Sequence, residues 1–291
     1  MRAVSSLFAV VVTIVALLAG RASAGPSIEA PPSMAAFAAR VRAVDLAELG
    51  RALTRAGLTL PDDVRVTLVP DDDPRARPVP QWVVGLASGP RDIVIFPQRV
   101  PPYPYDSIES VFRHEVAHLA LAARAGGAPL PRWFHEGVAM SIDRGWDTSG
   151  QLRLLLEMIR SPRTEQLGQL FASNTQPESA LAYGLSAALV ADLQQRHDPA
   201  VIGALAAQVA AGVPFARGFE IETGETPDSA ASRAWAAYRR WTNWVPALTS
   251  GTATWALILA IAAGAYVTVR RRRIRRRRAW DEEESVPPTA P

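Results

Sequence analysis

The chain has 291 residues, a formal net charge of +3, and neither cysteine nor lysine. The missing cysteines exclude a disulfide framework, thiol chemistry and thiolate ligands, so any metal site must use histidine, aspartate or glutamate. With the arginine-rich residues 270–291 and the first segment, 1–24, set aside, the chain carries 21 arginines against 24 acidic residues, a balance that argues against a polyanionic partner such as nucleic acid.

Residues 1–24 have the pattern of a secretory signal. Arg2 supplies a positive start, residues 7–19 form an apolar run, and residues 22–24 are the small residues of a cleavage site. The alternative is an uncleaved N-terminal anchor, but the apolar run is short for a membrane span. We therefore expect a signal peptide at 1–24, which places the chain after it outside the cytoplasm.

Residues 25–61 are expected to form a linker followed by an N-terminal helix. Residues 25–33 read "GPSIEAPPS", a composition typical of a linker. Apolar residues then recur with helical spacing through residues 34–56, and Gly57 is the expected stop.

Residues 62–245 are expected to form one α+β domain. Residues 64–70 alternate like a strand, and residues 82–87 and 92–97 predict two more strands with a turn between them. Helical periodicity then follows at residues 107–124, 131–143, 151–160, 164–172, 180–196, 200–211 and 228–241. A few strands followed by many helices predict a small N-terminal sheet and a mostly helical second half.

The helix predicted at 107–124 carries the first candidate metal ligands. Asp106 and Glu109 have the spacing of a capping box at its start, and the glycines after residue 124 end it. His114 and His118 are four residues apart and therefore lie on one face of this helix, where both can reach one ion. Glu115 is displaced by about 100° around the helix, where it can accept a proton from water at the metal.

A catalytic zinc site needs a third protein ligand, and the next helix offers two candidates. His135 and Glu136 are adjacent in the helix predicted at 131–143, so they cannot both face the ion. Gly137 favours Glu136, because a glycine lets this helix approach its neighbour closely. Spacing alone leaves both residues open as the third ligand.

Three motifs in this region together resemble a known group of enzymes. They are "HEVAH" at 114–118, "LPRW" at 130–133 and "EGVA" at 136–139. This combination resembles the gluzincin metallopeptidases, specifically the bacterial peptidase MA-like families. Residues 182–193 and 212–235 also resemble the helical half of those families, so the similarity covers about residues 62–241.

The resemblance implies a zincin-like peptidase fold, a Zn²⁺ ion and a peptide or protein substrate. It implies His114, His118 and Glu136 as zinc ligands and Glu115 as the general base of hydrolysis. Tyr183 matches the position at which these families carry a tyrosine that stabilises the oxyanion. The alternative for Tyr183 is an aromatic residue that only packs between helices.

Two further expectations concern the surroundings of the site. In the families resembled, the residue four positions after the third ligand is often acidic and orients a zinc-bound histidine, whereas here it is Met140 and the nearest carboxylate is Asp143. Losing such a partner typically costs about 10- to 100-fold in metal affinity or activity. Residues 91–97 are the candidate edge strand for an extended substrate, with a central place in the sheet as the alternative.

The C-terminal part predicts a membrane anchor. Residues 248–269 contain no charged residue and are long enough to cross about 30 Å of hydrocarbon as a helix. The arginines at 270–278 then mark residues 270–291 as a cytoplasmic tail. The sequence therefore predicts a single-pass cell-membrane protein whose domain at 62–245 lies outside the cytoplasm, and the resemblance implies that this domain is a zinc peptidase. The alternative is a non-catalytic module of the same fold that binds zinc or a peptide at the membrane.

Overall fold

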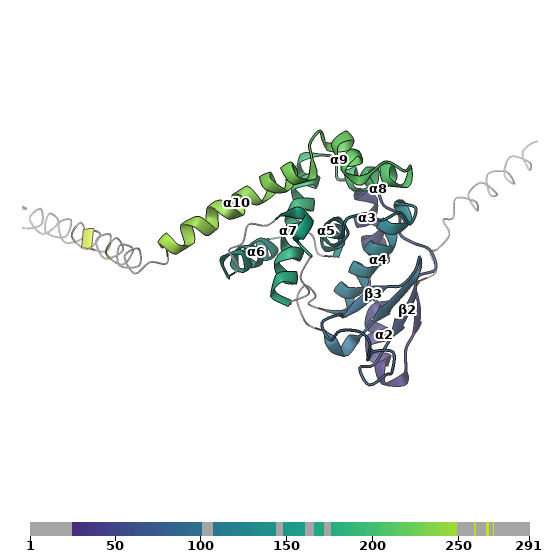
Figure 1. Ribbon diagram of the computed structural model, residues 1–291. Coiled ribbons are helices and arrows are strands. Elements are labelled where there is room, and N and C mark those ends of the chain that lie inside the picture. Colours follow the sequence, from purple (N-terminus) through teal and green to yellow (C-terminus); the bar gives the residue numbers. More distant parts are fainter. Residues whose placement is uncertain are drawn as a thin grey trace, which may run out of the picture. The chain divides into compact units, whose positions relative to one another are not determined.

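The structure is a computed structural model that describes residues 25–100, 107–143, 148–160, 166–171 and 176–248, with residues 259, 266–267 and 270 beyond them. The chain divides into two compact units, Met1–Trp235 and Ala236–Pro291. The candidate site lies in the first unit, whose elements are labelled in Figure 1. The predicted signal peptide at 1–24 lies outside the described residues.

The first unit contains a small mixed sheet. Its strands are β1 (Ser27–Glu29), β2 (Arg65–Leu68), β3 (Gly85–Ala87) and β4 (Asp92–Ile95). They lie in the order β1-β2-β4-β3, in which β1, β2 and β4 are parallel and β3 is antiparallel to β4. Alternate residues of β2 and β4 are buried, as the alternating pattern predicts.

The helices follow mostly after the sheet. They are α2 (Ala35–Arg42), α3 (Leu46–Arg55), α4 (Ile108–Arg124), α5 (Arg132–Asp143), α6 (Thr148–Arg160), α7 (Gln176–Arg196), α8 (Val201–Ala210), α9 (Phe215–Thr223) and α10 (Pro227–Leu248), with 3₁₀ turns at Pro32–Met34, Pro97–Arg99 and Leu167–Gln169. The α+β class with a small sheet and a mostly helical remainder is confirmed.

The N-terminal region differs from the prediction at two places. The expected linker contains strand β1, which pairs with β2 in parallel. The backbone amide of Ser27 also donates a hydrogen bond to the carbonyl oxygen of Val64 at 2.9 Å. The helix expected at 34–56 is two helices, because the carboxylate of Asp45 accepts from the amides of Ala47 and Glu48 and starts a new helix there.

Two more differences lie in the helical half. Only the 3₁₀ turn Leu167–Gln169 forms in the described part of the helix expected at 164–172. Helix α9 was not expected, although Pro214 precedes it and Gly224, at φ +76°, ends it. Proline before a helix and glycine after it are ordinary start and stop signals. The prediction rested on hydrophobic periodicity, which did not reveal a separate helix between these two residues.

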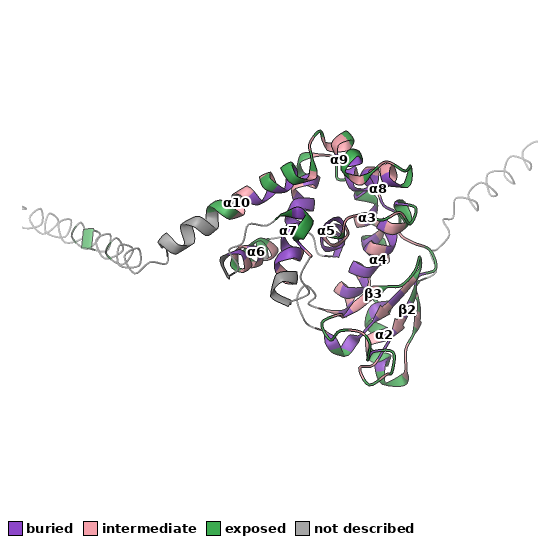
Figure 2. Cartoon of the chain, in the orientation of Figure 1, coloured by how far each residue is buried: buried purple, intermediate pink, exposed green. Residues whose placement is uncertain are grey.

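Helices α4, α5 and α7 form the centre of the unit. Helix α4 contacts the strands β3 and β4 and also packs against α5, which in turn packs against α7 (Figure 1). The faces at these contacts are buried (Figure 2). Gly137 makes the α5–α7 contact possible, because a Cβ atom there would lie 2.5 Å from the carbonyl oxygen of Ser186. The close approach at Gly137 is therefore to α7 and not, as the sequence argument assumed, to α4.

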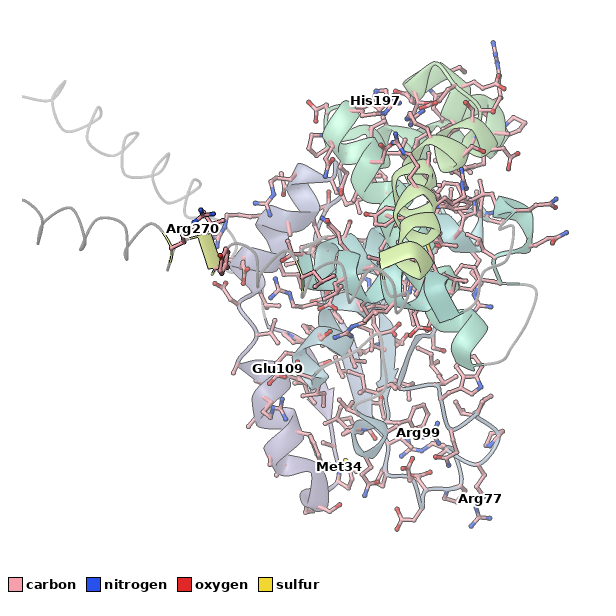
Figure 3. All side chains as sticks on the ribbon, turned by 90° about the vertical axis from the view of Figure 1, so that its left-hand side faces the viewer. Met34, Arg77, Arg99, Glu109, His197 and Arg270 are labelled. Carbon is pink, nitrogen blue, oxygen red and sulfur yellow. The ribbon has the colours of Figure 1, made fainter. Side chains whose placement is uncertain are left out.

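A buried arginine fixes the loop that precedes β3. The side chain of Arg99 is 1% exposed, pairs with Asp71 at 2.7 Å and lies over the ring of Phe96. It also donates hydrogen bonds to four loop carbonyls, those of residues 76, 79, 80 and 83. Figure 3 shows Arg99 on the inner side of this loop and Arg77 at its outer edge. The loop therefore holds β3 in a defined position although it has little regular structure.

The membrane prediction falls largely on residues outside the described part. Of the helices that the structure describes, none combines the length and the apolar character that a membrane crossing requires. The predicted span at 248–269 is described only at residues 248, 259, 266 and 267, and the tail at 270–291 only at Arg270.

Candidate metal centre

The structure brings His114, His118 and Glu136 to one point. The Nε2 atoms of the two histidines are 3.1 Å apart, and Oε2 of Glu136 lies 3.4 Å from His114 Nε2 and 3.5 Å from His118 Nε2. Among the described residues these three form a group whose ligand atoms lie within 4.8 Å of one another. His114 is buried, and His118 and Glu136 are only partly accessible. The group can therefore hold a metal ion.

The distances within this group fit a tetrahedral zinc ion. Zinc binds histidine nitrogen at about 2.0–2.1 Å and carboxylate oxygen at about 2.0–2.2 Å, which places the ligand atoms of a tetrahedron about 3.3–3.5 Å apart. The three observed separations of 3.1, 3.4 and 3.5 Å are close to this edge length. Three protein ligands leave one tetrahedral position for water or substrate, as catalytic zinc sites require. A proton shared among the same atoms is also compatible with these distances.

Local sequence signals place the two histidines on α4. The helix is capped by Ser107, whose hydroxyl accepts a hydrogen bond from the amide of Ser110, and this cap lies one residue after the predicted cap at Asp106. It ends in a Schellman motif, in which the amides of Gly126 and Gly127 bond back to the last turn and both glycines have positive φ. The histidines lie well inside these limits and so keep the spacing of four residues.

Glu136 and not His135 completes the group. Helix α5 begins at Arg132, one residue after the predicted start at Pro131, and its register directs the carboxylate of Glu136 toward the two histidines. His135 lies beside the group, with its ring centroid 5.6 Å from that of His118. Burial, and then the charge of His118, lower the pKa of His135 to about 4, so its ring is neutral at physiological pH.

Burial and neighbouring charges shift the pKa values of Glu136 and His118 in opposite directions. Burial favours the neutral carboxyl of Glu136, but hydrogen bonds with both histidines outweigh it and hold the pKa of Glu136 below its usual value. Burial likewise opposes the charged form of His118, yet Glu136 and Glu115 raise the pKa of His118 above its usual value. A divalent cation that binds here therefore displaces a proton from His118, so the affinity of the site rises with pH.

Glu115 lies next to this group and against the sheet. Its residue exposure is 3%, and burial is the main cause that raises the pKa of its carboxyl. The backbone amide of Ala87 in β3 acts in the opposite direction by hydrogen bonding to the carboxylate. A Cβ atom on Gly85 would lie 2.8 Å from Oε1 of Glu115 and 2.7 Å from a methyl group of Val111. Strand β3 thus fixes where the Glu115 carboxylate can lie.

Replacing Gly85 with alanine is expected to slow any reaction that uses the Glu115 carboxylate about 10- to 100-fold in kcat, because the new methyl group displaces that carboxylate and misplaced reacting groups lose rate steeply. Metal affinity should change less than kcat, since the nearest atoms that the new methyl group meets belong to Val111 and Glu115 and not to His114, His118 or Glu136. The matched control is Gly50→Ala on α3, where a Cβ atom meets nothing within 4 Å. An unchanged kcat in Gly85→Ala would show that β3 does not position Glu115.

Tyr183 reaches the site from α7. Burial raises the pKa of its hydroxyl, the charge of Glu136 adds to this rise, and Arg132 opposes it through its charge and a hydrogen bond. The ring of Tyr183 packs edge-to-face on Phe171, with 5.6 Å between centroids. The guanidinium of Arg132 lies over the same phenylalanine at 4.6 Å. Tyr183 therefore packs between helices and also lies within electrostatic range of the metal ligands, so the two roles considered for it are compatible.

Met140 and Asp143 differ in their surroundings. Met140 is buried at 5% exposure and supplies no charge. Asp143 is also buried, and its carboxylate accepts a hydrogen bond from the hydroxyl of Ser110 at 2.5 Å. Ser110 lies one helical turn before His114, so this bond joins α4 to α5 next to the candidate metal ligands. Such a bond to a charged group contributes about 1.5–3 kcal/mol to stability.

The expected edge strand is wrong. Residues 91–97 include β4, which lies inside the sheet between β2 and β3. Strands β1 and β3 are the two edges of the sheet, and β3 is the edge strand beside Glu115 on α4. The sequence pattern could not decide this, because both segments are short and apolar and the edge position depends on pairing order.

No protein-family model, curated protein or solved structure matches the chain.

Sequence reasoning missed three residues that the structure adds to this site. Gly85, Ser110 and Arg132 lie near the candidate catalytic or metal-binding groups, and although Arg132 belongs to the "LPRW" motif, none of the three was singled out as a site residue. The spacing of Ser110, four residues before His114, and of Arg132, four residues before Glu136, was the available signal, since it places each on the same helical face as a ligand.

Proposed function

We propose that the chain is an extracytoplasmic, membrane-anchored zinc peptidase with a zincin-like fold. The single observation that supports this most directly is the triangle of His114 Nε2, His118 Nε2 and Glu136 Oε2, with separations close to those of a tetrahedral zinc site. The buried carboxylate of Glu115 next to that triangle adds the base that hydrolysis needs. The resemblance of the motifs to gluzincin peptidases agrees with this proposal.

Each residue has a distinct role in peptide hydrolysis. Zinc, when bound, supplies Lewis-acid chemistry by lowering the pKa of water and polarising a carbonyl group. Glu115 accepts a proton from the attacking water and then delivers it to the leaving amine as the C–N bond breaks. The burial that raises the pKa of Glu115 suits this double role, because a base with a pKa nearer the working pH also returns its proton readily.

Tyr183 is the proposed donor to the oxyanion. Its raised pKa keeps the phenol protonated over the physiological range, so its O–H group is available as a donor. A single donor of this kind typically contributes about 10²- to 10³-fold to kcat. The substrate would lie extended along the edge strand β3, which replaces the strand expected from the sequence.

A second candidate function follows from Met140. The residue four positions after the third ligand carries no charge, which favours the non-catalytic module over an enzyme with a full set of supporting acids. The Asp143–Ser110 bond beside the candidate ligands and the buried carboxylate of Glu115 support the enzyme. A protein that only binds zinc or a peptide does not require a general base.

The two functions are separated by metal content and turnover of the full-length protein. We expect about one zinc ion per chain by mass spectrometry of the metal, and cleavage of a mixed peptide library that stops on chelation and returns with added zinc. Stoichiometric zinc without cleavage would support the non-catalytic module. The absence of bound zinc at neutral pH would contradict the peptidase and the zinc-binding form of the module, and would leave only a module that binds a peptide.

A further inference from the structure

With a divalent ion bound, the candidate site would carry one positive charge beyond those that its two carboxylates offset. The ion would offset the carboxylates of Glu115 and Glu136, both of which are largely buried. Arg132 stands at the same site, with its Nε atom 3.6 Å from Oε1 of Glu136. Because the second oxygen of Glu136 faces the histidines, a bound ion takes up much of the charge that would otherwise pair with Arg132. With an ion bound, the guanidinium of Arg132 would therefore be a positive charge that neither carboxylate fully offsets.

The guanidinium of Arg132 is held in place on one side and open on another. Its face lies over the ring of Phe171 at 4.6 Å, and it hydrogen-bonds to the hydroxyl of Tyr183, which packs on the same ring. Its side chain is nevertheless 45% exposed, compared with 12% for Glu136. A guanidinium that is packed on a ring yet belongs to a half-exposed side chain suits the binding of a planar anion, because it presents its N–H groups in a rigid fork.

We infer that Arg132 is a specificity-determining residue that binds a carboxylate of the substrate close to the scissile bond. This inference rests on the proposed peptidase function and names its substrate class: peptides with an acidic side chain or a free C-terminal carboxylate next to the bond that is cleaved. A carboxylate matches the guanidinium with two parallel hydrogen bonds, whereas an amide matches only one and carries no charge.

The geometry of helix α5 supports a position of the bound substrate carboxylate near the scissile bond. Arg132 lies one turn before Glu136 on α5, so the two side chains share one face of that helix. Arg132 also contacts Tyr183, the proposed oxyanion donor. With Glu136 as a metal ligand and Tyr183 as the oxyanion donor, these two contacts of Arg132 would place a substrate carboxylate within one or two residues of the reacting carbonyl. If Arg132 served only as an ion-pair partner of Glu136, its side chain would not need to be 45% exposed to solvent.

The first test measures the ratio of kcat/KM for matched acid and amide substrates. A peptide that the full-length, zinc-loaded protein cleaves is made with Glu or Gln at each position near the scissile bond, and with a free or an amidated C-terminus. We expect the acid to be preferred about 10- to 100-fold at one of these places, as for other hydrogen bonds to charged groups. In Arg132→Gln the ratio should fall to about 1, and Arg132→Lys should keep only part of it.

The ratio separates specificity from general damage. Arg132→Gln also disturbs Tyr183 and so lowers kcat for every substrate, but that loss cancels when acid and amide are compared. The matched control is Arg217→Gln on α9, an exposed arginine that pairs with Glu220 away from the site. Its ratio should equal that of the wild type. No preference in the wild type, or a preference that survives in Arg132→Gln, would overturn the inference.

A binding measurement tests the same residue without turnover. The zinc-loaded Glu115→Gln protein is titrated calorimetrically with Ala-Ala-Glu-Ala-Ala and Ala-Ala-Gln-Ala-Ala, each with a free and an amidated C-terminus. Tighter binding of one carboxylate form, lost when Arg132→Gln is added, supports the inference even if no peptide is ever cleaved, in which case only the proposed hydrolysis fails. Equal binding of all four peptides, or binding of none, contradicts the inference, and cleavage by the wild type would then leave the peptidase proposal intact.

Discussion

Replacing Glu115 with glutamine is expected to lower kcat for peptide hydrolysis by about 10²- to 10⁴-fold, the range typical of a lost general base. Glutamine has almost the same size, so it fits between α4 and β3, but it cannot take up a proton from water. Zinc should remain bound, because Glu115 lies outside the group of three ligands formed by His114, His118 and Glu136. The measurements are kcat on a cleaved peptide and the zinc content of the same preparation.

The matched control for this variant is another carboxylate on the same helix. Glu109 pairs with Arg40 at 2.7 Å on the exposed side of α4, so Glu109→Gln should keep kcat and lose less than about 1 kcal/mol of stability. Wild-type turnover in Glu115→Gln would show that hydrolysis, if present, uses another base. Loss of zinc together with activity would instead make Glu115 a metal ligand.

The parts of the site that sequence could predict are those set by local signals. The bounds of α4 follow from its periodicity and the glycine pair after residue 124, and the spacing of His114 and His118 then follows from helix geometry. The α+β class is equally local, because it requires only that strand patterns come before helical ones. These predictions depend on residues a few positions apart.

The parts that sequence could not predict depend on pairing between distant segments. Strand β1 forms only because β2 lies beside it, and its own sequence reads as a linker. The edge position of β3 depends on the order in which strands pair, and the approach of Gly137 to α7 depends on how three helices pack. The bond from Ser110 to Asp143 spans 33 positions, so no local pattern contains it.

The choice between His135 and Glu136 as the third ligand was only partly set by local sequence signals. Adjacent residues on a helix differ by about 100° in direction, so one of them had to point away from the ion, but the spacing did not say which. The register of α5 decides it, because the carboxylate of Glu136 lies 3.4 Å and 3.5 Å from the histidine nitrogens. This result also yields the sharpest test of the metal site.

Replacing Glu136 with glutamine is expected to reduce zinc affinity by more than about 100-fold, beyond the loss caused by removing a supporting partner. The carboxylate is the one anionic ligand among the three, so the amide removes its charge and weakens the oxygen donor. Competition with a chelator of known affinity at fixed pH gives the dissociation constant. The pH must be fixed, because the raised pKa of His118 makes zinc binding stronger as pH rises.

The neighbouring histidine provides the control for this last variant. His135→Gln alters a partly buried side chain beside the site but removes no member of the ligand group, so its zinc affinity should stay within about 10-fold of the wild type. The reverse pattern, with zinc lost in His135→Gln and retained in Glu136→Gln, would mean that α5 binds the ion through a different face. That outcome would also remove the charge balance from which a substrate carboxylate at Arg132 was inferred.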